Sequence, residues 1–178
     1  MKKYILFGLS LIISMTAFAG NNYAKYYQGL PKPMPEVAAP TIPNNNVSIT
    51  ECGGVGDGIT MNTIAFQKAI SKLSKLGGGH LNVPAGIYLT GLISLKDNID
   101  LHIERNAMIL LSPDKKDHFK TEDGATDNKT TPGINASNRK NISITGEGTI
   151  DGNGKWWRAV KRSKVSDAEW NQFKQMGG

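Results

Sequence analysis

Apolar residues in the middle of the chain change their spacing at residues 77–79. Before this point they recur every three or four positions, which is the spacing of one buried stripe on a helix. The stripe consists of Phe66, Ala69, Ile70, Leu73 and Leu76. Asn62 or Thr63 can cap the start of this helix, and Gly77 is suited to end it. The pattern therefore predicts an amphipathic helix over residues 62–76.

Beyond the three glycines at 77–79 the period becomes two, as in β-strands. Short alternating or continuous apolar stretches follow, separated by tight polar corners; they lie at 81–83, 88–95, 99–103, 108–111, 133–137 and 141–151. Strands this short cannot each bury one face of a sheet, but they can when stacked as successive turns of a coil. The pattern predicts an all-β fold, a parallel β-helix, with the helix at its start.

Polar segments interrupt and flank this coil. Residues 113–132 contain few apolar side chains and are expected to form a loop excursion. A surface helix is expected over Asp167–Gln175. Residues 20–46 are rich in Pro and Asn, and because proline is excluded from helix interiors and central strands, we expect an extended leader there. The β-helix domain is then residues 47–178.

The first nineteen residues have the three regions of a secretory signal peptide. Lys2 and Lys3 are followed by an apolar run over residues 4–13 and by the small-x-small sequence that ends at Ala19. The run is too short to span a bilayer, which takes about 20 apolar residues. We therefore expect cleavage after Ala19, export to the periplasm or the extracellular space, and no membrane attachment afterwards.

Charge and cysteine content limit the possible partners and the possible disulfide bonds. The 178-residue chain has a net charge of +6 at pH 7, and its densest basic cluster is at residues 161–164. This cluster has no interleaved aromatic residue and the chain has no nucleic-acid-binding motif, so a nucleic-acid partner is not expected. Cys52 is the single cysteine and cannot form a disulfide within the chain.

The glycine cluster at residues 53–58 could be compared with a dinucleotide-binding fingerprint. Gly54 and Gly56 supply its first two glycines, but the position of the third is occupied by Ile59. We therefore interpret the cluster as a turn that directs the chain into the helix, and we expect no cofactor.

Three ordered segments carry a resemblance to a known family. They are GGVGDGITMNTIAFQKAI, GGGHLNVPAGIYLTGLISLKDNIDLHIERNAMILLS and NISITGEGTIDGNGKWW. Together they resemble the N-terminal third of glycoside hydrolase family 28, the polygalacturonase-like pectin hydrolases, over residues 47–157. The resemblance implies a right-handed parallel β-helix whose first turn is covered by an α-helix, and which is incomplete at the C-terminal end of this chain.

The resemblance also implies a reaction, namely hydrolysis of α-1,4-galacturonosyl or related pectic linkages with inversion. The substrate would be polygalacturonate or rhamnogalacturonan, with no metal or cofactor, and the full-length protein would be a monomer. Inversion requires a carboxylic acid and a carboxylate base, typically ~6.5–9.5 Å apart. The family carries its catalytic groups in Asn-Thr-Asp, Asp-Asp, Gly-His-Gly and Arg-Ile-Lys segments. This sequence contains none of the four, so we assign no catalytic, cofactor-binding or metal-binding residue and expect the chain alone to be inactive.

Several residues outside these motifs invite a functional interpretation. Asp100, His102 and Glu104 share one face of a strand and could gather a metal or an acid and base, but outward polar positions of an alternating strand are the simpler interpretation. The same applies to His80 and His118, which belong to no recognisable pattern.

Trp156 and Trp157 could provide a flat apolar platform for a sugar ring. Packing of the following segment onto the coil is an equal alternative. On an extended chain neighbouring side chains face opposite ways, so each tryptophan would serve only one of these purposes.

Two other functions remain open at this point. One is a non-catalytic carbohydrate-binding or structural β-helix, as in tailspike-like adhesins, and the other is a pectate lyase of the same fold. In either case a coil with an open last turn exposes a strand edge, so we expect this chain to aggregate or to express poorly.

Overall fold

The computed structural model describes residues 26–35, 38–122 and 125–175. The chain divides into two compact units, residues 1–38 and 39–178. In the first unit, residues 26–35 consist mainly of turns, bends and irregular chain. The predicted signal peptide, residues 1–19, lies outside the described residues, and so does part of the predicted leader.

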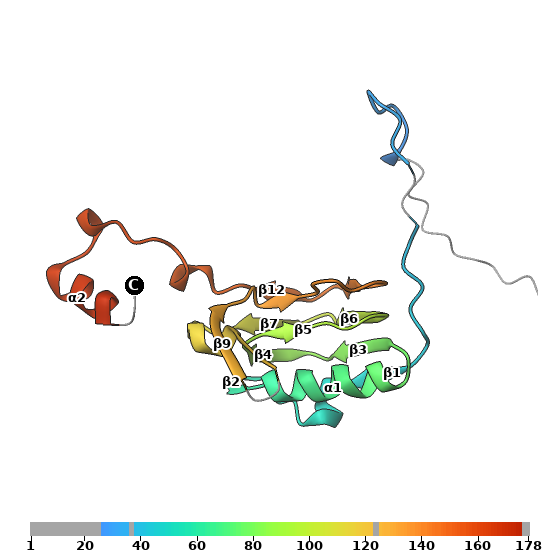
Figure 1. Cartoon of the computed structure of the whole chain (residues 1–178), viewed down its shortest axis with the longest axis horizontal. Coiled ribbons are helices and arrows are strands. Elements are labelled where there is room, and N and C mark those ends of the chain that lie inside the picture. The colour runs from blue at the N-terminus through green and yellow to red at the C-terminus, as the bar shows by residue number, and fades with distance from the viewer. Residues whose placement is uncertain (1–25, 36–37, 123–124, 176–178) are drawn as a thin grey trace, which may run out of the picture. The chain divides into compact units, whose positions relative to one another are not determined.

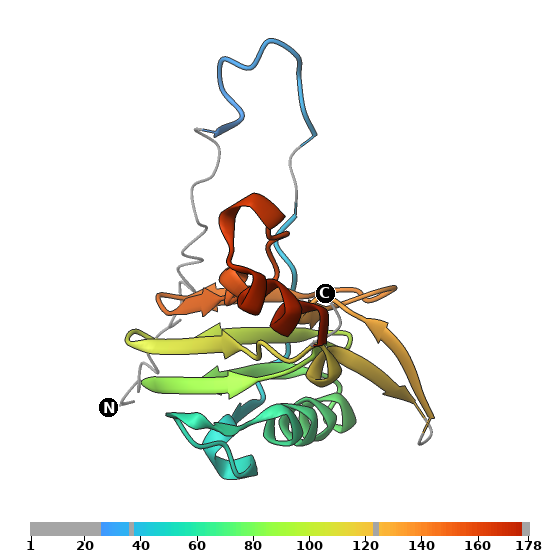
Figure 2. The same ribbon diagram turned by 90° about the vertical axis from the view of Figure 1, so that its left-hand side faces the viewer.

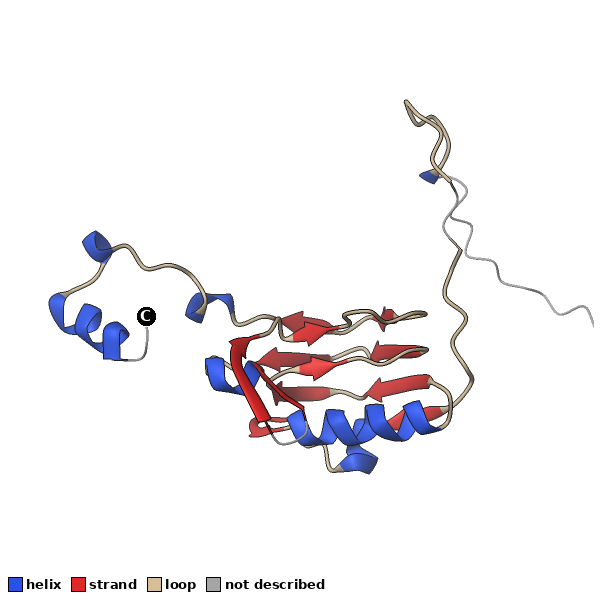
Figure 3. Cartoon of the chain, viewed as in Figure 1, coloured by secondary structure: helices blue, strands red, loops and turns tan. Residues whose placement is uncertain are grey.

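The second unit is built from short strands that stack in layers, with the helices outside the stack (Figure 3). Sheet A consists of β1 (Asn46–Ser48), β3 (Gly79–Val83), β6 (Ile99–Ile103) and β11 (Ser143–Gly146). Sheet B consists of β2 (Asp57–Met61), β4 (Gly86–Thr90), β7 (Ala107–Leu111) and β12 (Thr149–Asp151). Sheet C consists of β5 (Ile93–Ser94) and β10 (Ile134–Asn135). All pairings in these three sheets are parallel, so the predicted right-handed parallel β-helix is confirmed.

Parallel register aligns equivalent apolar side chains of successive coils in columns that fill the interior. One column contains Val47, Leu81, Leu101 and Ile144, and another contains Tyr88, Ile109 and Ile150. The members on the inner coils are buried. Ile144 and Ile150, on the last coil, are 49% and 39% exposed, because no strand among the described residues stacks on them. Burial in this fold therefore depends on cover at both sides, by a second coil or, over β1, by a helix.

Helix α1 (Thr63–Lys75) lies across the end of the coil that begins with β1 and β2 (Figures 1 and 2). It contacts β1, β3 and β5, and it buries the predicted stripe except at one position. Leu76, which the spacing assigns to the stripe, is instead 55% exposed, because the helix ends at Lys75 and Leu76 lies in the turn beyond it. The predicted capping role of the helix is otherwise confirmed.

Gly77 ends the helix as its sequence position predicts. Its N–H donates to the carbonyl of Ser74 at 3.1 Å, and the N–H of Gly78 donates to the carbonyl of Leu73 at 2.9 Å. Gly77 has a φ of 87°, which favours glycine at this position. At Gly78 a Cβ atom would lie 2.3 Å from the carbonyl oxygen of Asn98, so the chain can enter β3 only through a residue without a side chain.

Asn62 occupies the N-cap position of α1, but its side chain makes no capping hydrogen bond. Its Oδ1 accepts from the N–H of Val55 at 2.7 Å, and its Nδ2 donates to the carbonyls of Val55, Thr60 and Leu89 at 3.0, 2.7 and 3.2 Å. Asn62 therefore stands at the predicted position, but the capping hydrogen bond expected from its side chain is absent. Asn62 is a buried amide that joins the glycine-rich turn to β4.

The polar excursion at residues 113–132 is more regular than predicted. It contains the 3-10 helix η3 (Lys115–His118) and an antiparallel hairpin of β8 (Phe119–Glu122) and β9 (Ala125–Thr130). Its polar composition hid these strands because they pair with each other outside the three sheets of the coil. The remaining elements are η2 (Ile49–Cys52), η4 (Gly154–Trp156), η5 (Arg162–Lys164) and α2 (Asp167–Gln175), the last with the predicted bounds.

The columns predict a position-dependent cost of truncating interior side chains. Leu101→Ala removes a side chain buried between two coils and should lower the free energy of unfolding by about 2–5 kcal/mol. Ile144→Ala, next in the same column, should cost less than about 1 kcal/mol because that side chain is already half exposed. Urea unfolding followed by circular dichroism measures both changes, and equal costs would contradict the arrangement of the coils.

Candidate functional site

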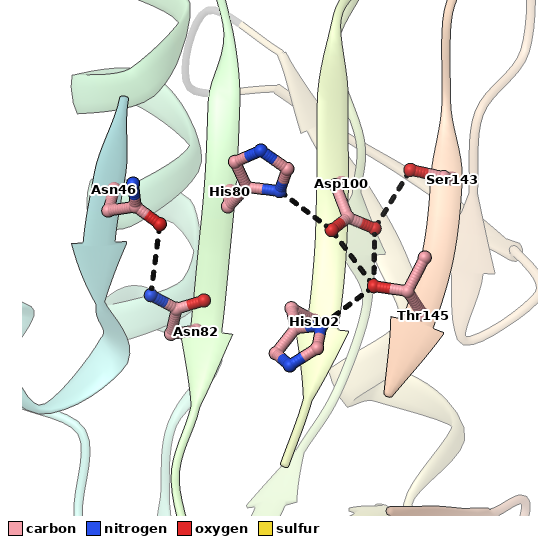
Figure 4. Close-up of polar contacts among 7 residues, drawn as sticks. All are labelled: Asn46, His80, Asn82, Asp100, His102, Ser143 and Thr145. Carbon is pink, nitrogen blue, oxygen red and sulfur yellow. Dashed lines mark hydrogen bonds and ion pairs between the residues drawn. The ribbon is translucent and has the colours of Figure 1, made fainter. Parts of the chain in front are cut away.

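The outer face of sheet A carries a row of polar side chains (Figure 4). Because strand residues alternate between two faces, the neighbours of the buried column point away from the interior. The parallel register then places polar residues of different coils side by side. They are Asn46, His80, Asn82, Asp100, His102, Ser143 and Thr145, and we call them the sheet A polar cluster.

Asp100 lies at the centre of this cluster. Its carboxylate accepts hydrogen bonds from Nδ1 of His80 at 2.9 Å and from Oγ of Ser143 at 2.8 Å. The hydroxyl of Thr145 lies 3.0 and 2.9 Å from its two oxygens. Although it points outward, Asp100 is only 3% exposed. Burial opposes its ionisation, but the hydrogen bonds and the charge of His80 outweigh burial, so the pKa of Asp100 lies below its usual value of 3.8.

The same bonds set the tautomers of two histidines. Thr145 has one hydroxyl hydrogen and donates it to Asp100, so its oxygen accepts from Nδ1 of His102, 2.8 Å away. Nδ1 of His80 likewise donates to the Asp100 carboxylate. In the neutral form of both rings Nε2 is then the nitrogen without a hydrogen.

Asp100 and His102 point outward, as the sequence interpretation expects. Asp100 is nevertheless buried, because side chains of β3 and β11 bond to its carboxylate. Glu104 is exposed and follows the end of β6. His80 does have a partner, which lies 20 residues away in sequence and one coil away in space. The parallel register between neighbouring coils brings this pair together, and because the coils differ in length no fixed spacing marks it in the sequence.

A second candidate lies on the other side of the coil, around the segment after β12. A cavity of about 320 Å³, which we call the Trp157 cavity, is lined by Leu111, His118, Thr131, Pro132, Gly133, Gly152 and Trp157. The rings of His118 and Trp157 meet edge to face, with centroids 5.1 Å apart. Lys155 lies over the ring of Trp156 at 5.2 Å. Trp156 ends a 3-10 helix and Trp157 follows it, so the extended chain assumed for these two residues is wrong.

Hydrogen bonds near the base of the β8–β9 hairpin hold His118, which lines the Trp157 cavity. Nε2 of the buried His118 lies 2.9 Å from the carbonyl oxygen of Ser112, and the Ser112 hydroxyl donates to the carboxylate of Asp117. The backbone carbonyl of Asp117 accepts from the N–H of Leu92, next to sheet C. In the segment after β12, Nδ2 of Asn153 donates to the carbonyl of Leu111 at 3.2 Å. Two residues that line the cavity, His118 and Leu111, are therefore hydrogen-bonded to neighbouring segments.

Neither place brings together the paired carboxyl groups that glycoside hydrolysis requires. In the sheet A polar cluster Asp100 is the one carboxylate, and no acidic residue lines the Trp157 cavity. In the described part of the chain, no three His, Cys, Asp or Glu side chains are placed to hold a metal ion. None of the helices in that part is long and apolar enough to cross a membrane. The assignment of no catalytic residue to this chain stays a prediction.

Several known proteins are similar to this chain in sequence or in fold. No protein-family model matches it. A probable polygalacturonase from Vitis vinifera is 39% identical over 135 residues, which cover 68% of this chain and 27% of the relative. The crystal structure of a hyperthermoactive exopolygalacturonase from Thermotoga maritima has a TM-score of 0.58 at 38% identity, covering 65% of this chain and 27% of that one. A family 28 exopolygalacturonase from Yersinia enterocolitica has a TM-score of 0.53 at 30% identity, covering 62% and 21%.

These similarities confirm the resemblance to family 28 that the three sequence segments suggest. The chain spans only about a quarter of the length of these relatives. The relatives are glycoside hydrolases of the polygalacturonase type.

The position of Asp100 generates a prediction about acid stability. A carboxyl whose pKa is lowered by folding adds stability above its unfolded pKa, near 3.8, and this stability is lost as the pH falls through the lower folded pKa. Asp100→Asn should lower the free energy of unfolding by about 1–3 kcal/mol at neutral pH, since three donors lose a charged acceptor. Below pH 3.8 the difference between the two proteins should shrink.

Urea unfolding at a series of pH values measures this difference. Glu104→Gln is the matched control, because Glu104 is an exposed carboxylate just after the same strand. It should leave the acid limb of the stability curve unchanged. A gap between the original protein and Asp100→Asn that stays constant down to the lowest pH would show that Asp100 ionisation does not stabilise the fold.

Proposed function

Because the chain resembles polygalacturonase-like glycoside hydrolases, we propose that it forms the first coils of an exported enzyme that hydrolyses pectic polysaccharide. The bonds cleaved are α-1,4-galacturonosyl or related linkages, with inversion at the anomeric carbon. The observation that carries this proposal is the 39% identity to a probable polygalacturonase over 135 residues. The likeness in fold to two exopolygalacturonases supports it.

The chemistry of inversion supports the proposal that catalysis requires coils beyond those of this chain. Inversion requires a carboxylic acid and a carboxylate base on opposite sides of the scissile bond, typically ~6.5–9.5 Å apart. Neither the sheet A polar cluster nor the Trp157 cavity has such a pair. The half-exposed Ile144 and Ile150 support the idea that further coils stack on β11 and β12. In this proposal those coils carry the catalytic carboxyls.

Substrate binding and partners follow from the same proposal. A polygalacturonate chain carries one carboxylate on each sugar, and arginine and lysine side chains pair with such groups. The reaction proceeds through protein carboxyl groups and water, so the proposal includes no metal and no cofactor. The partner is the polysaccharide itself, nucleic acid is not a partner, and the full-length enzyme acts as a monomer.

Reducing-end release from polygalacturonate tests the activity. The product of the complete reading frame should release reducing ends, and proton NMR of the first product should show an inverted anomeric configuration. The 178-residue chain alone should release none above background. Turnover by this chain alone would contradict the assignment of catalysis to later coils.

The same assay separates the two alternatives. Products that absorb in the ultraviolet, formed only with calcium, would replace hydrolysis by β-elimination. Retention on immobilised polygalacturonate without any cleavage by the complete product would replace the enzyme by a binding protein. Either result would overturn the proposed activity.

Export is the remaining element of the proposal, and it is carried by residues 1–19. Expression with the native N-terminus should yield a periplasmic or secreted protein whose first residue is Gly20. N-terminal sequencing of that fraction measures the cleavage site. Replacing Ala19 by a bulky residue such as Tyr should block processing, since signal peptidase accepts small residues at this position. Retention of residues 1–19 in the unchanged exported protein would contradict the proposal.

A further inference from the structure

Helix α2 carries an apolar edge that no strand covers. Trp170 and Phe173 lie three positions apart, which puts both side chains on one side of the helix. Both are partly exposed, no residue of α2 is buried, and in the described part of the chain α2 makes no extensive contact with a strand. Isolated helices shorter than about 12–15 residues are marginal in water, so a helix of 9 residues depends on packing. The apolar edge of α2 therefore lacks the partner that the length of the helix requires.

The start of α2 is nevertheless well defined. The N–H and the hydroxyl of Ser166 donate to the carboxylate of Glu169 at 2.9 and 2.8 Å, and the N–H of Glu169 donates back to the Ser166 hydroxyl at 3.3 Å. Arg162 pairs with Asp167 and lies over the ring of Trp170 at 5.8 Å. These contacts place the tryptophan on a helix that is already formed, so that little order is lost when the edge packs.

The last coil of the stack offers the complementary surface. Ile144 and Ile150 close the two interior columns and are 49% and 39% exposed. Val47 stands at the opposite end of the first of these columns, yet it is only 1% exposed, because α1 contacts β1. One end of the stack is thus covered by an apolar helix, and the other end has apolar side chains of the same columns without such cover.

The dimensions allow α2 to reach this surface. At 1.5 Å per residue its 9 residues span about 14 Å, and the four residues of β11 span about 13 Å. The tether between β12 and α2 is residues 152–166. At about 3.3 Å per residue an extended tether of this length reaches about 50 Å, which exceeds the width of a coil even when η4 and η5 shorten it.

Charge favours the same approach. The exposed cations of the tether are Lys155, Arg158, Lys161 and Lys164. Glu147 and Asp151 are exposed carboxylates on the last coil, and Glu147 already pairs with Arg105 at 2.6 Å. Opposite charges on the tether and on the end of the coil attract, so they favour conformations in which the tether turns back.

We propose that residues 152–175 form a strap that closes over the last coil. In the closed state Trp170 and Phe173 pack against Ile144 and Ile150, as the stripe of α1 packs at the first end. The strap covers apolar side chains and the strand edges of β11 and β12, which would otherwise promote aggregation. That the cover is temporary rests on the proposed function, which places further coils on β11 and β12. The strap then shields the growing end of the stack until the next coil replaces it.

Hydrogen exchange of the 178-residue chain, followed by mass spectrometry, tests the strap. The double variant Trp170→Ser with Phe173→Ser removes the apolar edge of α2. Amides of β11 and β12 should then exchange about tenfold faster than in the unchanged chain, because the cover of the last coil is lost. Amides of α1 and β3 should not change, which shows that the variant is folded. Light scattering should show earlier aggregation of this variant.

A matched control lies on the same helix. Asn171→Ser with Gln175→Ser changes two exposed polar residues of α2 and leaves the apolar edge in place. Exchange of β11 and β12 should be the same as in the unchanged chain. If the first variant aggregates too early for measurement, Phe173→Ser alone should accelerate exchange of the same amides to a smaller extent.

A double-mutant cycle identifies the surface that α2 contacts. Trp170→Ala and Ile150→Ala are compared, singly and together, by their urea unfolding midpoints. If the two side chains touch, the combined shift should be smaller than the sum of the single shifts. Ile87→Ala replaces Ile150→Ala in the control cycle, because Ile87 is 43% exposed on the outer face of sheet B. With this residue the shifts should add.

Three results would overturn the strap. They are unchanged exchange of β11 and β12 in the folded double variant, additive shifts for Trp170 and Ile150, and protection that disappears on dilution, which would assign the contact to a second copy of the chain. If the complete product still hydrolysed polygalacturonate in those cases, the proposed function would stand without the strap. If β11 and β12 were protected as expected but the complete product cleaved nothing, the strap would stand and the proposed function would fall.

Discussion

Stacking of each coil on its neighbour, in register, is the interaction on which this molecule depends. Individual strands of two to five residues bury almost nothing alone, yet Leu101 is fully buried because Leu81 and Ile144 lie on either side of it in the same column. The parallel ladder of backbone hydrogen bonds fixes this alignment. The same register orders the outer face of sheet A, since it brings the members of the sheet A polar cluster together from four different strands.

A stack of this kind has two ends, and the two differ in this chain. At the first end α1 lays its apolar stripe across the coil, and the glycines at 77 and 78 allow the chain to turn directly from the helix into β3. Asn62 secures the other end of the helix through four hydrogen bonds that reach as far as β4. At the last coil the interior side chains Ile144 and Ile150 remain half exposed.

Periodicity in the sequence was enough to predict the coil, its helix and α2, because helix and strand spacing depend on neighbours along the chain. It did not predict contacts between coils. His80 and Asp100 are 20 residues apart, whereas Asp100 and Ser143 are 43 apart, because the β8–β9 excursion lies between the second pair. Because the coils differ in length, residues that pair between coils do not recur at a fixed spacing in a single sequence. Asn62 was misassigned for the related reason that a distant strand, β4, competes for its amide.

The order of coils in space follows the order of residues in the chain. Each strand of sheet A pairs with the strand one coil earlier, from β1 through β3 and β6 to β11, and no pairing in this sheet waits for a segment made much later. When a new strand emerges, the strand with which it pairs has therefore already been made. This connectivity allows the polypeptide to fold progressively from its amino end, at the pace at which it leaves the ribosome.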